Sequence, residues 1–165
     1  MSSHTDSTLT RTAQLVIRHK TPHDLYLAGR SLLEKEQFQD AIIAFEMALE
    51  ECPEEPLYMS YLGLALAKAR RNGKRAIELC EKAARRHFYQ ADLLHNLGRV
   101  YLMSGQRGKA HVTFREGMGL GDDADRNFEG LEEMGVRIKP VFSFLDRKHP
   151  LNKYAGMTLK RLGMR

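Results

Sequence analysis

The sequence lacks any long hydrophobic run, and this absence limits where the protein acts. A membrane-spanning helix needs roughly 18 consecutive apolar residues, and no stretch of the 165-residue chain approaches that length. The first 20 residues hold one apolar cluster, Leu15 to Ile17, which is too short for the core of a secretory signal. We therefore expect a cytoplasmic protein.

Cysteine is scarce, and the motifs that carry chemistry are missing. Cys52 and Cys80 show neither a Cys-x-x-Cys spacing nor one typical of metal ligands, so we expect neutral thiols and no metal. No Gly-x-Ser-x-Gly, His-Glu-x-x-His or Cys-His-Asp arrangement occurs. Residues 105–109, GQRGK, fail the phosphate-loop pattern because Ala110 follows the lysine. The sequence predicts no enzyme, no cofactor and no small-molecule substrate.

Positive charge is distributed unevenly along the chain. Residues 137–165 hold eight Lys or Arg against the single Asp146, a net charge of +7, whereas residues 1–136 sum to −2. The larger part of the chain is thus near neutral and the C-terminal part is basic. Such an asymmetry indicates an anionic partner without identifying it.

A repeat of 34 or 35 residues organises the middle of the chain. Three segments align in register, beginning at Leu25, Met59 and Leu94. The matching positions are Gly29, Gly63 and Gly98, then Leu32, Leu66 and Tyr101, then Ala41, Ala76 and Ala110, then Phe45, Cys80 and Phe114, and finally Ala48, Ala83 and Gly117. Self-similarity at such a fixed period is the signature of stacked supersecondary units.

This order of residues, with Pro53 closing the first copy, resembles the tetratricopeptide repeat (TPR). The resemblance covers about residues 22–122, and the chain resembles a small bacterial-type TPR protein. It implies an all-α fold, an α-solenoid of three antiparallel helix-turn-helix repeats. The predicted repeats are 22–55, 56–90 and 91–122.

The segments that flank the repeats carry their own predictions. A repeat stack needs a terminal helix with a polar outer face, and residues 123–135 predict this C-terminal capping helix. Residues 136–165 predict a basic tail with an extended segment and a short helix. Residues 1–20 predict a flexible N-terminus.

Individual residues within the repeats predict how the helices pack. Gly29 is expected to let the two helices of the first repeat approach closely, and Phe45 to fill the gap to the next pair. In the second copy Cys80 replaces the large residue, which predicts looser packing or a different turn. In the third copy Gly117 and the glycines after it weaken the second helix by about 1 kcal/mol per interior glycine.

The first helices of stacked hairpins line a concave surface, and we expect the binding site in that groove. Tyr, Arg and Met anchor interfaces because they bury large area and keep a polar or adaptable end. The predicted contact residues are Tyr26, Arg30, Ser60, Tyr61, Leu64, His95, Asn96, Arg99 and Met103. They indicate a protein or peptide partner and a scaffold, adaptor or chaperone-like function. The alternative is that half of them simply face water.

Some TPR domains grip the acidic C-terminus of heat-shock chaperones with a two-carboxylate clamp of Lys, Asn and Arg side chains. The matching positions here hold Tyr26, Arg30, Tyr61, Asp92 and Asn96, so the clamp is absent. The resemblance therefore does not imply a chaperone-tail adaptor. In size and three-repeat layout, the chain is similar to the translocator chaperones of type III secretion.

Two basic features leave an alternative function open. A basic patch crowds the turn inside the second repeat, with Arg70, Arg71, Lys74 and Arg75. A charge run of this kind usually faces solvent. The tail either packs its phenylalanines onto the repeats or forms a basic arm, and an arm favours binding to nucleic acid or an anionic membrane. These residues predict no particular oligomeric state.

Overall fold

Seven α-helices make up the described part of the chain. The computed structural model describes residues 21–87, 89–120 and 124–135, and these residues contain no strand. The helices are α2 (Pro22–Glu34), α3 (Phe38–Glu51), α4 (Pro56–Lys68), α5 (Gly73–Arg86), α6 (Ala91–Met103), α7 (Arg107–Met118) and α8 (Ala124–Glu133). The predicted all-α class is confirmed.

Local sequence sets where several helices begin. Thr21 and Asp24 form a capping box at α2, in which the Asp24 N–H donates to Thr21 Oγ1 at 3.1 Å and the Thr21 N–H donates to the Asp24 carboxylate at 3.2 Å. Pro22 and Pro56 occupy the first turns of α2 and α4, where a missing N–H costs nothing. Asn72 caps α5 from a left-handed backbone with φ 43°.

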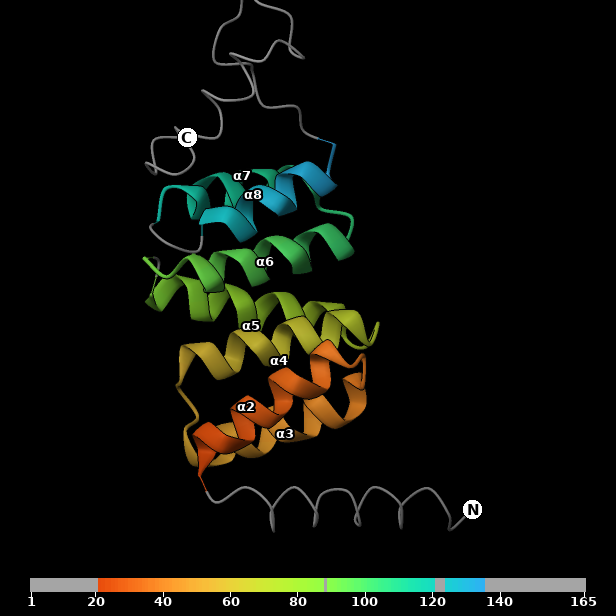
Figure 1. Cartoon of the computed structure of the whole chain (residues 1–165), viewed down its shortest axis with the longest axis vertical. Coiled ribbons are helices and arrows are strands. Elements are labelled where there is room, and N and C mark those ends of the chain that lie inside the picture. Colours follow the sequence, from red (N-terminus) through yellow and green to blue (C-terminus); the bar gives the residue numbers. More distant parts are fainter. Residues whose placement is uncertain (1–20, 88, 121–123, 136–165) are drawn as a thin grey trace, which may run out of the picture.

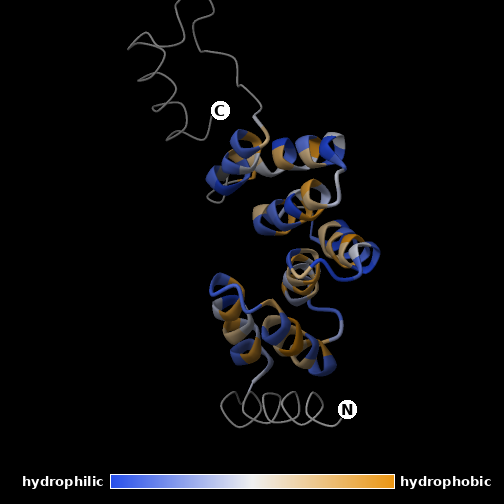
Figure 2. Ribbon diagram, turned by 90° about the vertical axis from the view of Figure 1, so that its right-hand side faces the viewer, coloured by the Kyte–Doolittle hydropathy of each residue, from blue (hydrophilic) through white to orange (hydrophobic). Residues whose placement is uncertain are grey.

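The helices pair into three hairpins that stack along one axis (Figure 1). α2 packs on α3, α4 on α5 and α6 on α7, and α8 packs on both α6 and α7. Between hairpins, α4 contacts α3, and α6 contacts both α4 and α5. Each helix carries both hydrophobic and hydrophilic residues, whereas the connecting loops are mostly hydrophilic (Figure 2). The predicted α-solenoid of helix-turn-helix repeats is confirmed.

In the first and third hairpins, a glycine of the first helix lies directly against an aromatic ring of the second. A Cβ atom on Gly29 would lie 2.6 Å from the Phe45 ring, and one on Gly98 would lie 2.5 Å from the Phe114 ring. Only glycine permits this approach, because real Cβ contacts are essentially never so short. Phe45 also lies 5.9 Å from the Tyr61 ring, so it fills space inside its own hairpin as well as toward the next.

The second hairpin closes on a cysteine instead of a ring. A Cβ atom on Gly63 would lie 2.5 Å from Cys80 Sγ and 2.8 Å from the Ala76 carbonyl oxygen, so the backbone of α5 itself approaches α4. Cys80 is fully buried, and its thiol donates to the Ser60 carbonyl oxygen at 3.3 Å. The smaller side chain brings the helices closer, and the packing here is tight rather than loose.

α8 docks on the third hairpin through the same kind of contact. A Cβ atom on Gly130 would lie 2.6 Å from the Phe114 ring, and one on Gly117 would lie 2.5 Å from the Asn127 side chain. Asn127 Nδ2 donates to the Ala91 carbonyl oxygen at 3.1 Å, which fixes α8 against the start of α6. Gly117, expected to weaken its own helix, therefore makes room for the next one.

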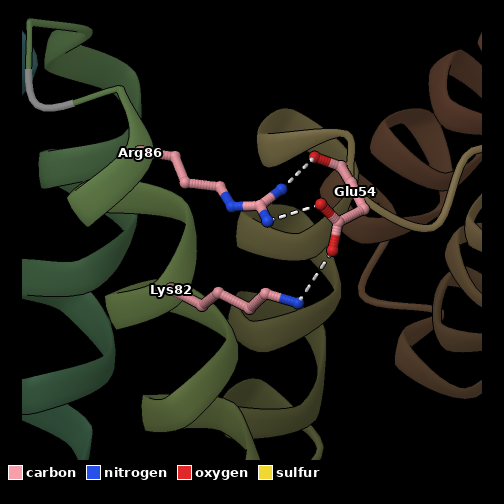
Figure 3. A network of polar contacts seen from close by, with 3 residues as sticks. All are labelled: Glu54, Lys82 and Arg86. Atoms are coloured by element: carbon pink, nitrogen blue, oxygen red, sulfur yellow. Dashed lines mark hydrogen bonds and ion pairs between the residues drawn. The ribbon is translucent and has the colours of Figure 1, made fainter.

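Charged groups tie the loop between α3 and α4 to α5 (Figure 3). Glu54 forms ion pairs with Arg86 and with Lys82, whose Nζ lies 3.4 Å from Glu54 Oε1. The hydrogen bond and charge of Arg86, with help from Lys82, lower the pKa of Glu54. All three side chains are exposed to solvent, where ion pairs are weak. These ion pairs therefore fix the position of the loop more than they stabilise the fold.

The predictions for the two ends of the chain concern residues outside the described ranges. The flexible N-terminus of residues 1–20 and the extended and helical tail of residues 136–165 lie outside the described residues. The three repeat boundaries and the limits of the capping segment remain predictions. None of the helices α2 to α8 in the described part of the chain combines the length and the apolar character that a membrane-spanning helix requires.

Replacing Gly98 with alanine should destabilise the fold, because the new methyl group meets the Phe114 ring. Overpacking costs about 1–3 kcal/mol, which exceeds the roughly 1 kcal/mol that alanine gains in helix propensity. Urea unfolding should therefore show a lower midpoint for Gly98→Ala.

Gly108→Ala is the matched control, since Gly108 also lies in a helix and a Cβ there meets nothing within 4 Å. This control should raise stability by about 0.5–1 kcal/mol. Equal effects of the two substitutions would contradict the packing described for Gly98.

Candidate functional site

The first helix of each hairpin, together with α8, contributes to one cavity of about 220 Å³, which we call the first-helix cavity. A cation from each of these helices lines it: Arg30 of α2, Lys68 of α4, Arg99 of α6 and Arg126 of α8. Glu34 is the one carboxylate in the lining. The cavity therefore favours an anionic or hydrogen-bond-accepting group.

The structure brings a majority of the predicted contact residues to this cavity and places the others elsewhere. Those in its lining are Arg30, Tyr61, Leu64, His95 and Arg99. Tyr26, Ser60 and Asn96 are buried at 4% exposure or less, and Met103, 41% exposed, lines a different groove. Tyr61 and Leu64 are also buried, so the accessible edge comes from the partly exposed Arg30, His95 and Arg99. Whether these residues contact a partner remains a prediction.

A cluster of aromatic rings supports Arg30. The Tyr26 ring stacks on Tyr58 with centroids 5.1 Å apart and meets Tyr61 edge-on at 5.4 Å. The Arg30 guanidinium lies 5.7 Å from the Tyr26 centroid and 5.4 Å from the Tyr61 centroid. Burial raises the pKa of Tyr26 to about 12, so its phenol stays neutral. The rings hold Arg30 in place without cancelling its charge.

Behind the cavity, a buried hydrogen bond joins α4 to α6. Asn96 Nδ2 donates to Ser60 Oγ at 3.1 Å, and both residues are fully buried. A buried polar group costs free energy unless it is hydrogen-bonded, so this pair favours one packing of α4 against α6. Here Ser60 and Asn96 act as packing residues that shape the wall of the cavity.

Two ion pairs tie α8 to α6 beside the cavity. Arg99 pairs with Glu133, and Arg126 pairs with Asp92. Arg126 and Glu133 are absent from the sequence-based set because they lie beyond the three repeats. Each pair nevertheless joins residues 34 positions apart, which is the repeat period. Extending the repeat alignment beyond the third copy therefore identifies Arg126 and Glu133. The two carboxylates offset two of the four cations in the lining.

His95 lies close to these arginines and is neutral. Burial, reinforced by the charges of Arg126 and Arg99, lowers its pKa to about 4. Its Nδ1 atom is buried and has no hydrogen-bond partner among the described residues. The ring packs 5.9 Å from Phe114, the side chain at the centre of the third hairpin. His95 thus couples the wall of the cavity to the core.

A larger groove of about 940 Å³ lies where the turns of the second and third hairpins meet, and we call it the turn groove. Arg70, Arg71 and Lys74 of the predicted basic patch line it, whereas Arg75 does not and pairs with Glu46 at 3.1 Å. Met103 also belongs to this groove. Lys68 and Arg99 line both hollows, so the turn groove adjoins the first-helix cavity.

Recognition through charge and hydrogen bonds is the chemistry that the first-helix cavity offers. Among the residues that the structure describes, no group of three His, Cys, Asp or Glu side chains is placed to hold a metal ion. Burial raises the pKa of Cys80 to about 12, so this thiol stays protonated inside its hairpin. Cys52 is exposed and unpaired with any other cysteine of the described part.

Comparisons with known proteins identify the fold. The crystal structure of the Sgt2 TPR domain from Aspergillus fumigatus is similar, with a TM-score of 0.55 and 18% sequence identity over 80% of this chain and 93% of that one. No protein-family model and no curated protein sequence matches the chain. At this identity the likeness shows the fold alone. The chain has the tetratricopeptide-repeat fold that its sequence resembles.

Stability should fall as the pH drops from about 6.5 to about 4, partly because of His95. Its pKa is lowered from 6.5 to about 4 by folding, so the unfolded chain binds the proton first and the native state loses stability between these values. The loss attributable to His95 should reach about 3 kcal/mol below pH 4.

The measurement is urea unfolding of the wild type and His95→Gln at several pH values. The variant keeps every titrating carboxylate, so the difference between the two pH profiles isolates His95. Its profile should be flatter between about pH 6.5 and 4. Parallel profiles would contradict the buried, neutral imidazole.

Proposed function

We propose that this protein is a cytoplasmic protein-interaction module, a scaffold, adaptor or chaperone, that holds an extended segment of a partner protein along its first helices. The observation that carries the proposal is the first-helix cavity, to which α2, α4, α6 and α8 each contribute a cation. A site that spans stacked helices suits a peptide segment running across the repeats. The tetratricopeptide-repeat fold supports the general interaction role.

The dimensions of the cavity favour side chains of a partner over a small-molecule substrate. Sites for small molecules typically measure about 300–1,000 Å³. The first-helix cavity measures about 220 Å³, which suits one or two side chains. Arg30 is the cation best placed to meet a partner carboxylate or carbonyl, because it rests on two tyrosine rings and forms no ion pair within the described residues.

A photocrosslinking experiment tests the first-helix cavity directly. A photoreactive phenylalanine derivative replaces Glu34, which is exposed and lines the cavity. The matched control carries the same group at Val112 of α7, which is 54% exposed and lies outside both grooves. In an extract of the source organism, position 34 should crosslink a partner protein and position 112 should not. Equal crosslinking at both positions would contradict the proposal.

Replacing Arg30, the cation that rests on two tyrosine rings, should weaken binding of the partner identified by crosslinking. Arg30→Gln keeps the length and hydrogen bonding of the side chain but loses its charge, and we expect about ten-fold weaker affinity. Arg115→Gln, at an exposed position of α7, serves as the control and should change affinity less than about two-fold. Isothermal titration with the purified partner measures both.

A second candidate function rests on the charge of residues 137–165, which carry a net +7. Such a segment favours binding to nucleic acid or an anionic membrane surface. At about 50 mM salt, a fluorescent oligonucleotide or anionic vesicle should then bind the full chain and lose binding when the chain is truncated after residue 135. Absence of binding by the full chain at this salt concentration would reject this function.

A further inference from the structure

The turn groove is a surface that the proposed function leaves unused. It has a volume of about 940 Å³ and is lined by the end of α4, the turn after it, the start of α5 and the end of α6. Phe38 of α3 lines the side toward the first hairpin. The groove is therefore built by three hairpins, so the folded array is needed to form it.

Positive charge dominates the turn groove. Its charged lining residues are Lys68, Arg70, Arg71, Lys74 and Arg99. The lining includes no aspartate or glutamate, in contrast to the first-helix cavity, which contains Glu34. Arg99 is already paired with Glu133, whereas Arg70 and Lys74 have no carboxylate partner in the described part of the chain. Of the two hollows described above, the turn groove thus carries the more unpaired positive charge.

The turn that presents these cations has an ordered backbone. Arg70 and Asn72 adopt left-handed conformations with φ 53° and φ 43°. The Arg71 N–H donates to the Leu66 carbonyl oxygen at 2.9 Å, and the Arg71 side chain donates to Gln39 Oε1 of the first hairpin at 2.6 Å. A turn held in this way loses little conformational entropy when a ligand binds.

Apolar side chains form the rest of the groove. Phe38, Ile77 and Met103 are all partly exposed there, Met103 by 41%. The Lys68 ammonium lies 5.7 Å from the Phe38 centroid, so cation and ring are adjacent. Methionine adapts its shape to varied partners. A ligand that fits this surface carries both negative charge and a large apolar group.

Charge argues against the terminal segments of this chain as occupants. Residues 1–20 carry a net +2 and residues 137–165 a net +7, so the groove repels both. Single-stranded nucleic acid has the right charge but binds chiefly by stacking its bases on aromatic side chains. Phe38 is the single aromatic residue in the lining, and Lys68 already lies over it. A protein segment that combines Asp or Glu with apolar residues meets both requirements.

We infer that the turn groove binds an acidic segment of a partner protein. Carboxylates of the segment contact Arg70 and Lys74, and a large apolar side chain packs on Phe38, Ile77 and Met103. The inference rests on the proposed function only in that the partner is a protein. Arg70, Lys74, Phe38, Ile77 and Met103 line the turn groove and not the first-helix cavity, although Lys68 and Arg99 line both. The inference adds the chemical character of the partner, which is negative and apolar at this contact.

The test measures fluorescence anisotropy of labelled peptides with the full chain at about 50 mM salt. The probe peptide consists of repeated Glu-Glu-Leu-Phe units. One control peptide replaces every Glu with Gln, and the other replaces every Leu and Phe with Ser. The probe should bind about ten-fold more tightly than either control and weaken as salt is added. Equal binding of the three peptides, or no binding of the probe, overturns the inference.

A pair of double variants locates the contact. Arg70→Asn with Lys74→Ala removes the two unpaired cations, and asparagine is chosen because it tolerates the left-handed backbone at position 70. Arg85→Ala with Arg115→Ala removes two exposed cations outside the groove. The first variant should weaken probe binding about ten-fold and the second less than about two-fold, with both retaining the wild-type melting temperature. Equal losses overturn the inference.

Other occupants give different results. Tighter binding of an oligonucleotide than of the probe, abolished by the Arg70 and Lys74 changes, assigns the groove to nucleic acid and overturns the inference. Self-association that the same changes abolish assigns it to a second copy, with the same consequence. Crosslinking at position 34 without probe binding leaves the proposed function standing and removes this inference. Probe binding without crosslinking at position 34 leaves this inference standing and removes the proposed binding in the first-helix cavity.

Discussion

The contact between a glycine of the first helix and a side chain of the second sets the spacing inside each hairpin, and the rest of the structure depends on that spacing. Where the partner is Phe45 or Phe114, a ring separates the two backbones. Where it is Cys80, the helices close until the Ala76 carbonyl oxygen approaches the first helix. Because hairpins stack on one another, these distances also determine how the first helices face each other and where a cavity remains.

Large rings, rather than close backbones, join the first helices of the first two hairpins, whereas α3 packs directly on α4. α2 has little direct contact with α4, whereas α4 and α6 pack extensively. Tyr26, Tyr58 and Tyr61 fill the intervening space, and Arg30 rests on two of them. At the other end of the first-helix cavity, Arg126 is held by a carboxylate instead. The cavity thus has a cation supported by rings at one end and ion-paired cations at the other, so its ends differ in free charge.

The repeat and the hairpins were predictable because glycine and alanine recur wherever two backbones touch. The exposure of individual groove residues was not. Tyr26, Ser60 and His95 occupy the same position of the repeat, three residues before Gly29, Gly63 and Gly98. Tyr26 and Ser60 are nevertheless buried, whereas His95 is partly exposed. Their exposure depends on the distance to the neighbouring hairpin, which no local pattern encodes. The turn groove was equally hidden, since residues as distant as Phe38 and Met103 form it together.

The position of α8 carries a consequence for the role of Phe114. Gly130 of α8 and Gly98 of α6 both approach the Phe114 ring, and α8 packs on both helices of the third hairpin, as the first helix of a further repeat would. Within the described residues, α8 is therefore received by the same kind of glycine-to-ring contact that joins α6 to α7. A single ring that receives two glycines thus serves both to close a hairpin and to dock the helix that follows it.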